Sequence, residues 1–445
     1  MKVKKGVNVV ACMKKIKLNP DVTIIVTVHN AENYIEQCIQ SAMHQTYENI
    51  EIICVDGGSS DSTPDILKSL QSIDDRIIIV NDKNTSYGHK VNVGVEKARG
   101  QYVCILESDD SIEKDMVKTL YEITKEKNVD VISGDYKIQF EYRGRKIGYI
   151  QHKYPSGLYD RVCDLRSEKR FFLHGGITGV LYKKSFLQNN RIKLNETPGA
   201  AFQDQSFSFL VDLLAMTQYH IKTPVYNYTY DNPGSSMADD KKIMEISWEC
   251  NYIEQQMNSR EIEEQYIWEN YYNYKYATYI AKMKSFSVAG KAKFKKQFME
   301  EYKNDLPEIK KRSICMTALT IRELSEFLEN PDCFDGYQPE ERPVKRMIHI
   351  LDVLDQYATV LVGVGRVGSY LIQIAGECEK EFKCVCDNSK NIQSTKWNGY
   401  YVRSLEDAAK KCKGCKFVIS VERFFDEIKA QLMSLGIEES DIVRY

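Results

Sequence analysis

Three carboxylates are crowded into four residues of the N-terminal half of the chain. Glu107, Asp109 and Asp110 follow the apolar run of residues 102–106, whose length and composition predict a buried strand. Like charges this close repel one another unless a cation lies among them. Ligands of open α/β sheets bind beyond the carboxyl ends of the strands. We therefore interpret the cluster as a divalent-metal site that would bridge the protein to a diphosphate.

A plainer interpretation treats the same stretch as the start of a helix. Asp110 would be the N-cap residue and Glu113 its partner three residues later. This interpretation accounts for Asp110 but leaves Glu107 and Asp109 unexplained, so the metal site is favoured.

Two further polar positions follow predicted strands. The β-branched run 22–28 contains Thr27 near its end, and the run 50–55 leads into Asp56. Helical patterns separate these runs, which predicts a doubly wound, mostly parallel sheet. Thr27, Asp56 and the acidic cluster should therefore line one crevice. For Asp56 taken alone, a turn residue bonded to its own backbone is the alternative.

Residues 21–237 carry ordered motifs that resemble family 2 glycosyltransferases. The matching stretches are 26–32 (VTVHNAE), 55–63 (VDGGSSDST), 98–100 (ARG), 106–110 (LESDD) and 195–204 (NETPGAAFQD). The resemblance implies an α/β nucleotide-diphospho-sugar transferase fold of the GT-A type. The sequence departs from the family pattern at His29, Glu107 and Gln203, where the family more often has Tyr, Asp and Glu.

The resemblance also implies roles for individual residues. Asp109 and Glu107 would be the ligands of Mg²⁺ or Mn²⁺. Asp204 would be the base that takes the acceptor hydroxyl's proton in an inverting displacement. Its alternative, an N-cap at the start of a helix, is compatible with that role. The expected nucleotide-sugar-binding residues are Thr27, His29, Glu32, Asp56, Lys90, Glu107, Ser108 and Asp109. For Lys90, a position in a solvated loop is an equal alternative.

Composition excludes several classes of protein. The 445 residues carry a formal net charge of −2, so nucleic acid is not an expected partner. The 13 cysteines are scattered and odd in number, which favours buried thiols in a reducing compartment over a disulfide framework. Cys412-x-x-Cys415 has no second pair, so no zinc site is expected. We expect a soluble, cytoplasmic protein; peripheral contact with the inner face of the membrane and a homodimer stay open.

The last hundred residues predict a separate module. Gly363-x-Gly365-x-x-Gly368 lies between a predicted strand and helix, and Asp387 follows about 20 residues later, as in a Rossmann-like dinucleotide site. A degenerate module used for packing or dimerisation is the equal alternative. The expected division is a leader (1–20), a GT-A domain (21–240), a helical region (241–345) and a Rossmann-like domain (346–445).

These features lead to one expected function and two rivals. The resemblance implies a metal-dependent hexosyltransferase that moves a sugar, expected to be UDP-linked, to a hydroxyl of a glycan or lipid-linked glycan in cell-surface or capsular polysaccharide synthesis. The rivals are a dinucleotide-dependent oxidoreductase and a non-catalytic nucleotide-sugar sensor, both using the C-terminal module. No Tyr-x-x-x-Lys pair follows Asp387, which argues against an independent dehydrogenase.

Overall fold

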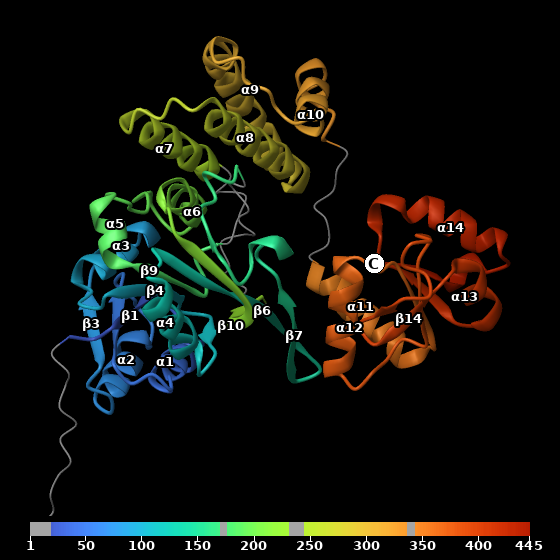
Figure 1. The fold of residues 1–445 in the computed structure, drawn as a ribbon, viewed down its shortest axis with the longest axis horizontal. Helices are drawn as coiled ribbons and strands as arrows, with labels where there is room; N and C mark the ends of the chain where they lie inside the picture. The colour runs from blue at the N-terminus through green and yellow to red at the C-terminus, as the bar shows by residue number, and fades with distance from the viewer. Residues whose placement is uncertain (1–18, 170–175, 231–243, 336–342) are drawn as a thin grey trace, which may run out of the picture.

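The computed structural model describes residues 19–169, 176–230, 244–335 and 343–445. A large sheet occupies the N-terminal half, four helices follow it, and a second, smaller sheet lies in the C-terminal hundred residues (Figure 1). All but two residues of the predicted leader lie outside the described part of the chain.

The first sheet has ten strands in the order β3-β2-β1-β4-β9-β6-β10-β5, with β7 paired to β6 and β8 to β10. Strands β1 to β4 are mutually parallel where they pair, whereas β9 runs antiparallel between β4 and β6. This mixed sheet is of the GT-A type, so the predicted fold class is confirmed. The strands are β1 (Val22–Val28), β2 (Ile50–Asp56), β3 (Ile77–Asn81), β4 (Tyr102–Glu107), β5 (Ser111–Ile112), β6 (Val131–Tyr142), β7 (Arg145–Gln151), β8 (Val162–Cys163), β9 (Val180–Lys183) and β10 (Gln218–Thr229).

Helices cover both faces of this sheet. Every residue of β1 and β2 is buried, and consecutive side chains enter opposite cores because a strand alternates its side chains between the two faces. Ile24 lies in one core and Ile25 in the other. The helices of this half are α1 (Ile35–Met43), α2 (Thr63–Gln71), α3 (Tyr87–Lys97), α4 (Met116–Lys127), α5 (Lys184–Asn189) and α6 (Gln203–Leu214).

Four helices continue the core that lies beside α3 and α6. An aromatic stripe is buried there: Trp268, Tyr271, Tyr272 and Tyr276 are at most 1% exposed. None of the helices in the described ranges is long and apolar enough to cross a membrane. The helices are α7 (Glu245–Ser259), α8 (Gln265–Ser285), α9 (Val288–Lys311) and α10 (Ala318–Glu329).

The second sheet is Rossmann-like, in the order β13-β14-β12-β11-β15-β16. Its strands pair in parallel apart from β13, which runs antiparallel to β14. The strands are β11 (Thr359–Val362), β12 (Cys384–Cys386), β13 (Lys396–Trp397), β14 (Tyr400–Arg403), β15 (Lys416–Ile419) and β16 (Ile442–Arg444). The helices are α11 (Pro343–Gln356), α12 (Arg366–Glu377), α13 (Leu405–Lys411) and α14 (Phe425–Ser434).

The C-terminal module covers the β6–β7 hairpin of the first sheet (Figure 1). The rings of Tyr149 and Tyr370 stack with their centroids 4.3 Å apart. Two side chains of α12 accept hydrogen bonds from backbone amides of the edge strand β7. Gln373 accepts from the Ile150 amide at 2.9 Å, and Glu377 accepts from the Gly148 amide at 2.7 Å. The module thereby satisfies a strand edge that would otherwise be open to pairing with another chain.

Candidate functional site

The carboxyl ends of β1, β2 and β4 bring the first predicted residues together. Thr27 is level with Glu107 in the β1–β4 register, and Val28 is level with Asp56 in the β1–β2 register. The hydroxyl of Thr27 donates to Oε2 of Glu107 at 3.2 Å. Residues far apart in the sequence therefore form one polar edge of the sheet.

Glu107 is the most constrained carboxylate of this edge. Its Oε1 accepts a 2.5 Å hydrogen bond from the phenol of Tyr87. Burial raises the pKa of Glu107 to about 7, and the negative charges of Asp109 and Asp204 add to that effect, whereas the hydrogen bonds from Tyr87 and Thr27 oppose it. Both carboxylate oxygens thus already accept hydrogen bonds within the protein. Sequence reasoning missed Tyr87, because no local pattern links the first residue of α3 to the end of β4.

Asp109 and Asp110 have different surroundings. Asp110 is buried and accepts hydrogen bonds from the Tyr226 hydroxyl and the Thr229 amide, both at 2.7 Å. Burial raises its pKa well above the ordinary range. Asp110 precedes the short strand β5, and α4 begins only at Met116, so the helix-cap interpretation is wrong. Asp109 is half-buried in the turn beyond β4.

Asp56 and Lys90 lie beside this edge. Oδ1 of Asp56 accepts from the amide of Ser59 at 3.0 Å and from its hydroxyl at 2.6 Å, the turn bonding expected of Asp before Gly. Lys90 is only 5% exposed, and its ammonium lies 3.4 Å from the Val28 carbonyl. Burial lowers its pKa, and the charges of Glu107 and Asp56 oppose that shift. The solvated-loop alternative for Lys90 is therefore wrong.

The remaining predicted nucleotide-sugar-binding residues are exposed or half-buried. His29 and Glu32 are exposed, and Ser108 is half-buried between Glu107 and Asp109. Oε2 of Glu32 accepts the Ser62 amide at 3.0 Å, which ties the loop after β1 to the loop after β2.

Asp204 lies in the first turn of α6, where Phe202 occupies the N-cap position with φ of +65°. Burial raises the pKa of Asp204; backbone amides and the charge of Lys282 oppose the shift. Its charge raises the pKa of both Glu107 and Tyr87, so Asp204 lies close enough to both for their charges to interact. Lys282, on α8, was not predicted. Its ammonium lies 4.6 Å from the centre of the Phe202 ring.

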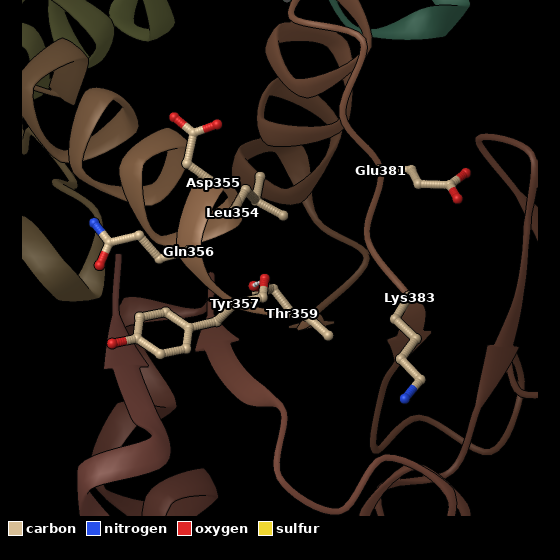
Figure 2. Close-up of a pocket in the computed structure, with 8 residues that line it drawn as sticks. Leu354, Asp355, Gln356, Tyr357, Thr359, Glu381 and Lys383 are labelled. Atoms are coloured by element: carbon tan, nitrogen blue, oxygen red, sulfur yellow. Dashed lines mark hydrogen bonds between the residues drawn. The ribbon is translucent and has the colours of Figure 1, made fainter.

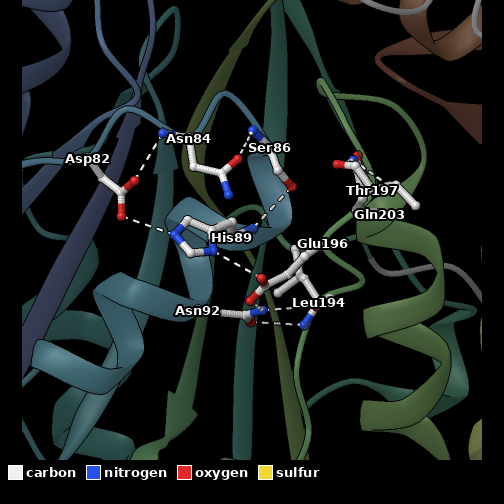
Figure 3. A network of polar contacts seen from close by, with 9 residues as sticks. All are labelled: Asp82, Asn84, Ser86, His89, Asn92, Leu194, Glu196, Thr197 and Gln203. Carbon is white, nitrogen blue, oxygen red and sulfur yellow. Dashed lines mark hydrogen bonds and ion pairs between the residues drawn. The ribbon is translucent and has the colours of Figure 1, made fainter.

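The segment that leads into Asp204 is bonded to α3 (Figure 3). We name residues 190–202 the α5–α6 loop. His89 lies between Asp82, at 3.0 Å, and Glu196, at 2.9 Å. The hydrogen bond to Glu196 is the main cause of the raised pKa of His89, although burial partly opposes it. Together, the contacts of His89 with Asp82 and Glu196 join the loop after β3 to the α5–α6 loop.

The C-terminal candidates lie at the β11–α12 turn. Gly363 has φ of +106°, and a Cβ on Gly368 would come within 2.5 Å of the Gly363 carbonyl, so both positions favour glycine. Asp387 accepts the amide of Val364 at 3.0 Å and that of Ser389 at 2.8 Å. Its carboxylate braces the glycine turn.

A cavity of about 440 Å³ lies at the opposite, amino-terminal edge of the second sheet (Figure 2). It is lined by residues of the C-terminal module, whereas Glu107 lies on β4 and Asp204 on α6. Its lining residues are Leu354, Asp355, Gln356, Tyr357, Ala358, Thr359, Glu381 and Lys383.

Sequence comparison decides the family of the N-terminal domain. Residues 23–187, which run from the second residue of β1 to beyond β9, match the family model described as "Glycosyl transferase family 2". This domain belongs to glycosyl transferase family 2. The predicted family is thereby confirmed.

The family 2 domain has curated relatives. The chain is 30% identical over 228 residues to the putative glycosyltransferase EpsH of Bacillus subtilis (strain 168), which is 51% of this chain and 65% of EpsH. It is 31% identical over 213 residues to the glycosyltransferase GlyA of Streptococcus pneumoniae serotype 4, which is 46% of this chain and 30% of GlyA. Each match spans less than two thirds of the relative's own length.

A solved structure also resembles this chain. Residues 1–349 of S. aureus TarS, in complex with UDP-GlcNAc, superpose with a TM-score of 0.46 at 19% sequence identity. The match covers 58% of this chain and 73% of that one.

Proposed function

We propose that this protein is an inverting glycosyltransferase that moves a sugar from a UDP-linked donor to a hydroxyl of a glycan or lipid-linked glycan in cell-surface or capsular polysaccharide synthesis. One observation carries the proposal. The phenol of Tyr87 bonds Glu107 at the end of β4, and its backbone amide bonds Gly199 in the loop that leads into Asp204, so both carboxylates lie at the same end of the sheet. Donor and acceptor chemistry require such an arrangement, because a diphosphate must leave one side of the sugar while a base acts on the other.

The carboxylates of the β4 turn suit a divalent cation shared with the donor. Mg²⁺ and Mn²⁺ prefer oxygen ligands, and Mg²⁺ sites typically use one or two carboxylates plus substrate phosphates. The described residues contain no group of three or more His, Cys, Asp or Glu side chains able to hold a metal by themselves. Asp109 and Glu107 would be the ligands of the cation, and the hydrogen bonds from Thr27 and Tyr87 would hold the Glu107 carboxylate in place. The bound ion would stabilise the charge on the departing diphosphate.

Asp204 would take the proton of the acceptor hydroxyl. Burial raises its pKa, which makes it a stronger base, and the nearby charge of Lys282 favours its ionised form. A base on the face opposite the leaving group gives inversion at the anomeric carbon.

The donor would lie along the carboxyl edge of the first sheet. Thr27 and Asp56 would hold the nucleoside, with His29 and Glu32 at the exposed rim. Ser108 would flank the diphosphate. Lys90 acts indirectly, since its buried ammonium faces the Val28 carbonyl and balances the charges of Glu107 and Asp56.

The proposal is tested by the rate at which UDP is released from UDP-glucose, UDP-galactose and UDP-GlcNAc with Mn²⁺, with water taking the sugar in place of the glycan hydroxyl. Asp204→Asn should lower kcat by about 10²- to 10⁴-fold with the donor KM unchanged, the usual range for loss of a general base. Asp212→Asn is the matched control, because Asp212 also lies on α6 but contacts Gln218 on β10. Wild-type turnover in a folded Asp204→Asn protein would refute the assignment of the base.

A further inference from the structure

The α5–α6 loop is held on one side by the first turns of α3. The amide side chain of Asn92 bonds both backbone groups of Leu194, at 2.9 and 3.0 Å, and also reaches Glu196 at 3.0 Å. The amide of Tyr87 donates to the Gly199 carbonyl at 2.7 Å. Figure 3 shows the Asn92 contacts beside the His89 bridge. This side of the loop is therefore tied to the helix that carries Tyr87.

The opposite side of the loop is held by one buried carboxylate. Glu249, on α7, is 0% exposed. Its Oε1 accepts from the Asn195 side-chain amide at 3.0 Å and from the Thr197 hydroxyl at 3.3 Å. Its Oε2 accepts from the hydroxyl of Ser206, which lies in the first turns of α6. A single side chain thus bonds the loop and the helix on both sides of Asp204.

Glu249 lies close enough to Asp204 for their charges to interact. Burial is the main cause that raises the pKa of Glu249 to about 7; the hydrogen bonds from Ser206, Asn195 and Thr197 oppose the shift, and the negative charge of Asp204 contributes to it. Gln203 reinforces the same arrangement, because its side chain accepts the Ala201 amide at 2.7 Å and donates to the Thr197 hydroxyl at 2.9 Å. Thr197 is therefore a shared point of attachment for α6 and α7.

We propose that Glu249 is a positioning residue for the transfer reaction: through Asn195, Thr197 and Ser206 it fixes the α5–α6 loop and the first turn of α6, so that the Asp204 carboxylate faces the carboxylates at the end of β4. This inference rests on the proposed function, in which Asp204 is the base. It assigns to the helical region a direct part in the geometry of the site, which the family 2 motifs themselves do not contain.

Hydrogen–deuterium exchange on the full-length protein tests the positioning without any ligand. Glu249→Gln keeps an acceptor for Asn195 and Thr197 and an amide that can bond Ser206, whereas Glu249→Ala removes every contact. We expect amides 190–206 to exchange at least tenfold faster in Glu249→Ala and within twofold of wild type in Glu249→Gln. Glu254→Ala is the matched control, since Glu254 lies on α7 but bonds the Tyr271 hydroxyl at 3.2 Å. Wild-type exchange in Glu249→Ala would overturn the proposal.

The kinetic test uses UDP release from UDP-glucose, UDP-galactose and UDP-GlcNAc. Glu249→Ala should lower kcat at least tenfold and leave the donor KM within twofold, and Glu249→Gln should restore most of kcat. A kcat that stays at the wild-type value while exchange rises would show that the contacts do not position the base. Equal losses in the Ala and Gln variants would also contradict the proposal.

A second variant keeps the proposal testable if Glu249→Ala fails to fold. Asn195→Ala removes one partner from the loop side and should give an exchange rate and a kcat between those of wild type and Glu249→Ala. Unchanged exchange and kcat in Asn195→Ala would overturn the proposal. Failure of the proposed function is distinguishable: the wild-type protein would release no UDP from any of the three donors, while the exchange contrast would still report the contacts of Glu249.

Discussion

The phenol of Tyr87 donates a 2.5 Å hydrogen bond to Oε1 of Glu107, while the backbone amide of the same tyrosine bonds the Gly199 carbonyl at 2.7 Å. One residue therefore links the end of β4 to the α5–α6 loop. In the proposed mechanism, Tyr87 at the start of α3 therefore holds both the carboxylate of Glu107 and the loop that leads to the base, Asp204.

Tyr87→Phe should weaken donor turnover. The variant leaves the ring in place and removes the hydrogen bond to a half-buried carboxylate, which is worth about 1.5–3 kcal/mol. We expect kcat/KM for UDP release to fall about 10- to 100-fold. Tyr47→Phe is the control, because the Tyr47 phenol bonds Asp21 at 2.6 Å just before β1, at the opposite edge of the sheet. Equal kinetic effects of the two variants would contradict a specific role for Tyr87.

Most of the residues proposed to bind the donor could be predicted, because the end of a buried strand can be recognised in the sequence. The buried runs that became β1, β2 and β4 stop where polar residues begin, and parallel strands place those ends together. Thr27, Asp56 and Glu107 could therefore be grouped from sequence. The burial of Asp110 and its hydrogen bond with Tyr226 could not be predicted, because Tyr226 is 116 residues away on β10.

The residues around the α5–α6 loop were harder to predict, because their contacts also join parts of the chain that are far apart in the sequence. Asp204 could be proposed from its motif at the start of an apolar helix. Glu249 and Lys282 lie in helices whose local patterns indicate only a core face. Their contacts with residues 195–206 depend on how α7 and α8 pack, which no short-range spacing encodes.

Gly88→Ala should displace the α5–α6 loop. A Cβ on Gly88 would lie 2.0 Å from the backbone oxygen of Asn195, so the loop would have to move. Overpacking of this kind costs about 1–3 kcal/mol of unfolding free energy, and kcat should fall as well. Gly376→Ala on α12 is the control, because nothing lies within 4 Å of its Cβ and the change should stabilise the helix by about 0.5–1 kcal/mol. Full activity and stability in Gly88→Ala would contradict the close approach.

The His89 bridge should make the α5–α6 loop pH-dependent. The pKa of His89 is raised in the folded protein, chiefly by Glu196, so the charged imidazole stabilises the fold below pH 6.5. That contribution is lost as the pH rises through the raised value. Exchange of amides 194–199, corrected for intrinsic rates, should increase between pH 6 and 8 in wild type and change little in His89→Gln. The exposed His44, at the end of α1, provides the control variant His44→Gln. Identical pH profiles in wild type and His89→Gln would refute the bridge.

Asp212 should lower stability at neutral pH. It is 6% exposed, and burial raises its pKa from 3.8 to about 7. Because the folded state binds the proton more tightly than the unfolded chain, this residue's contribution to unfolding free energy falls as pH rises from about 4 to 7, by up to about 1.4 kcal/mol per pH unit. Urea unfolding across this range should show a shallower decline for Asp212→Asn than for wild type. Parallel curves would show that Asp212 is ionised throughout.

The most direct test of the proposed donor site is thermal unfolding with nucleotides. UDP, GDP, ADP, NAD⁺ and NADP⁺ would each be added with and without Mn²⁺ to the wild-type protein and to Asp109→Ala. A ligand at 100 times its Kd stabilises the folded state by about 2.7 kcal/mol, which shifts the melting temperature measurably. We predict a Mn²⁺-dependent shift with UDP that disappears in Asp109→Ala. A shift with NAD⁺ or NADP⁺ alone, unchanged in Asp109→Ala, would move ligand binding to the C-terminal module and contradict the proposed transferase site.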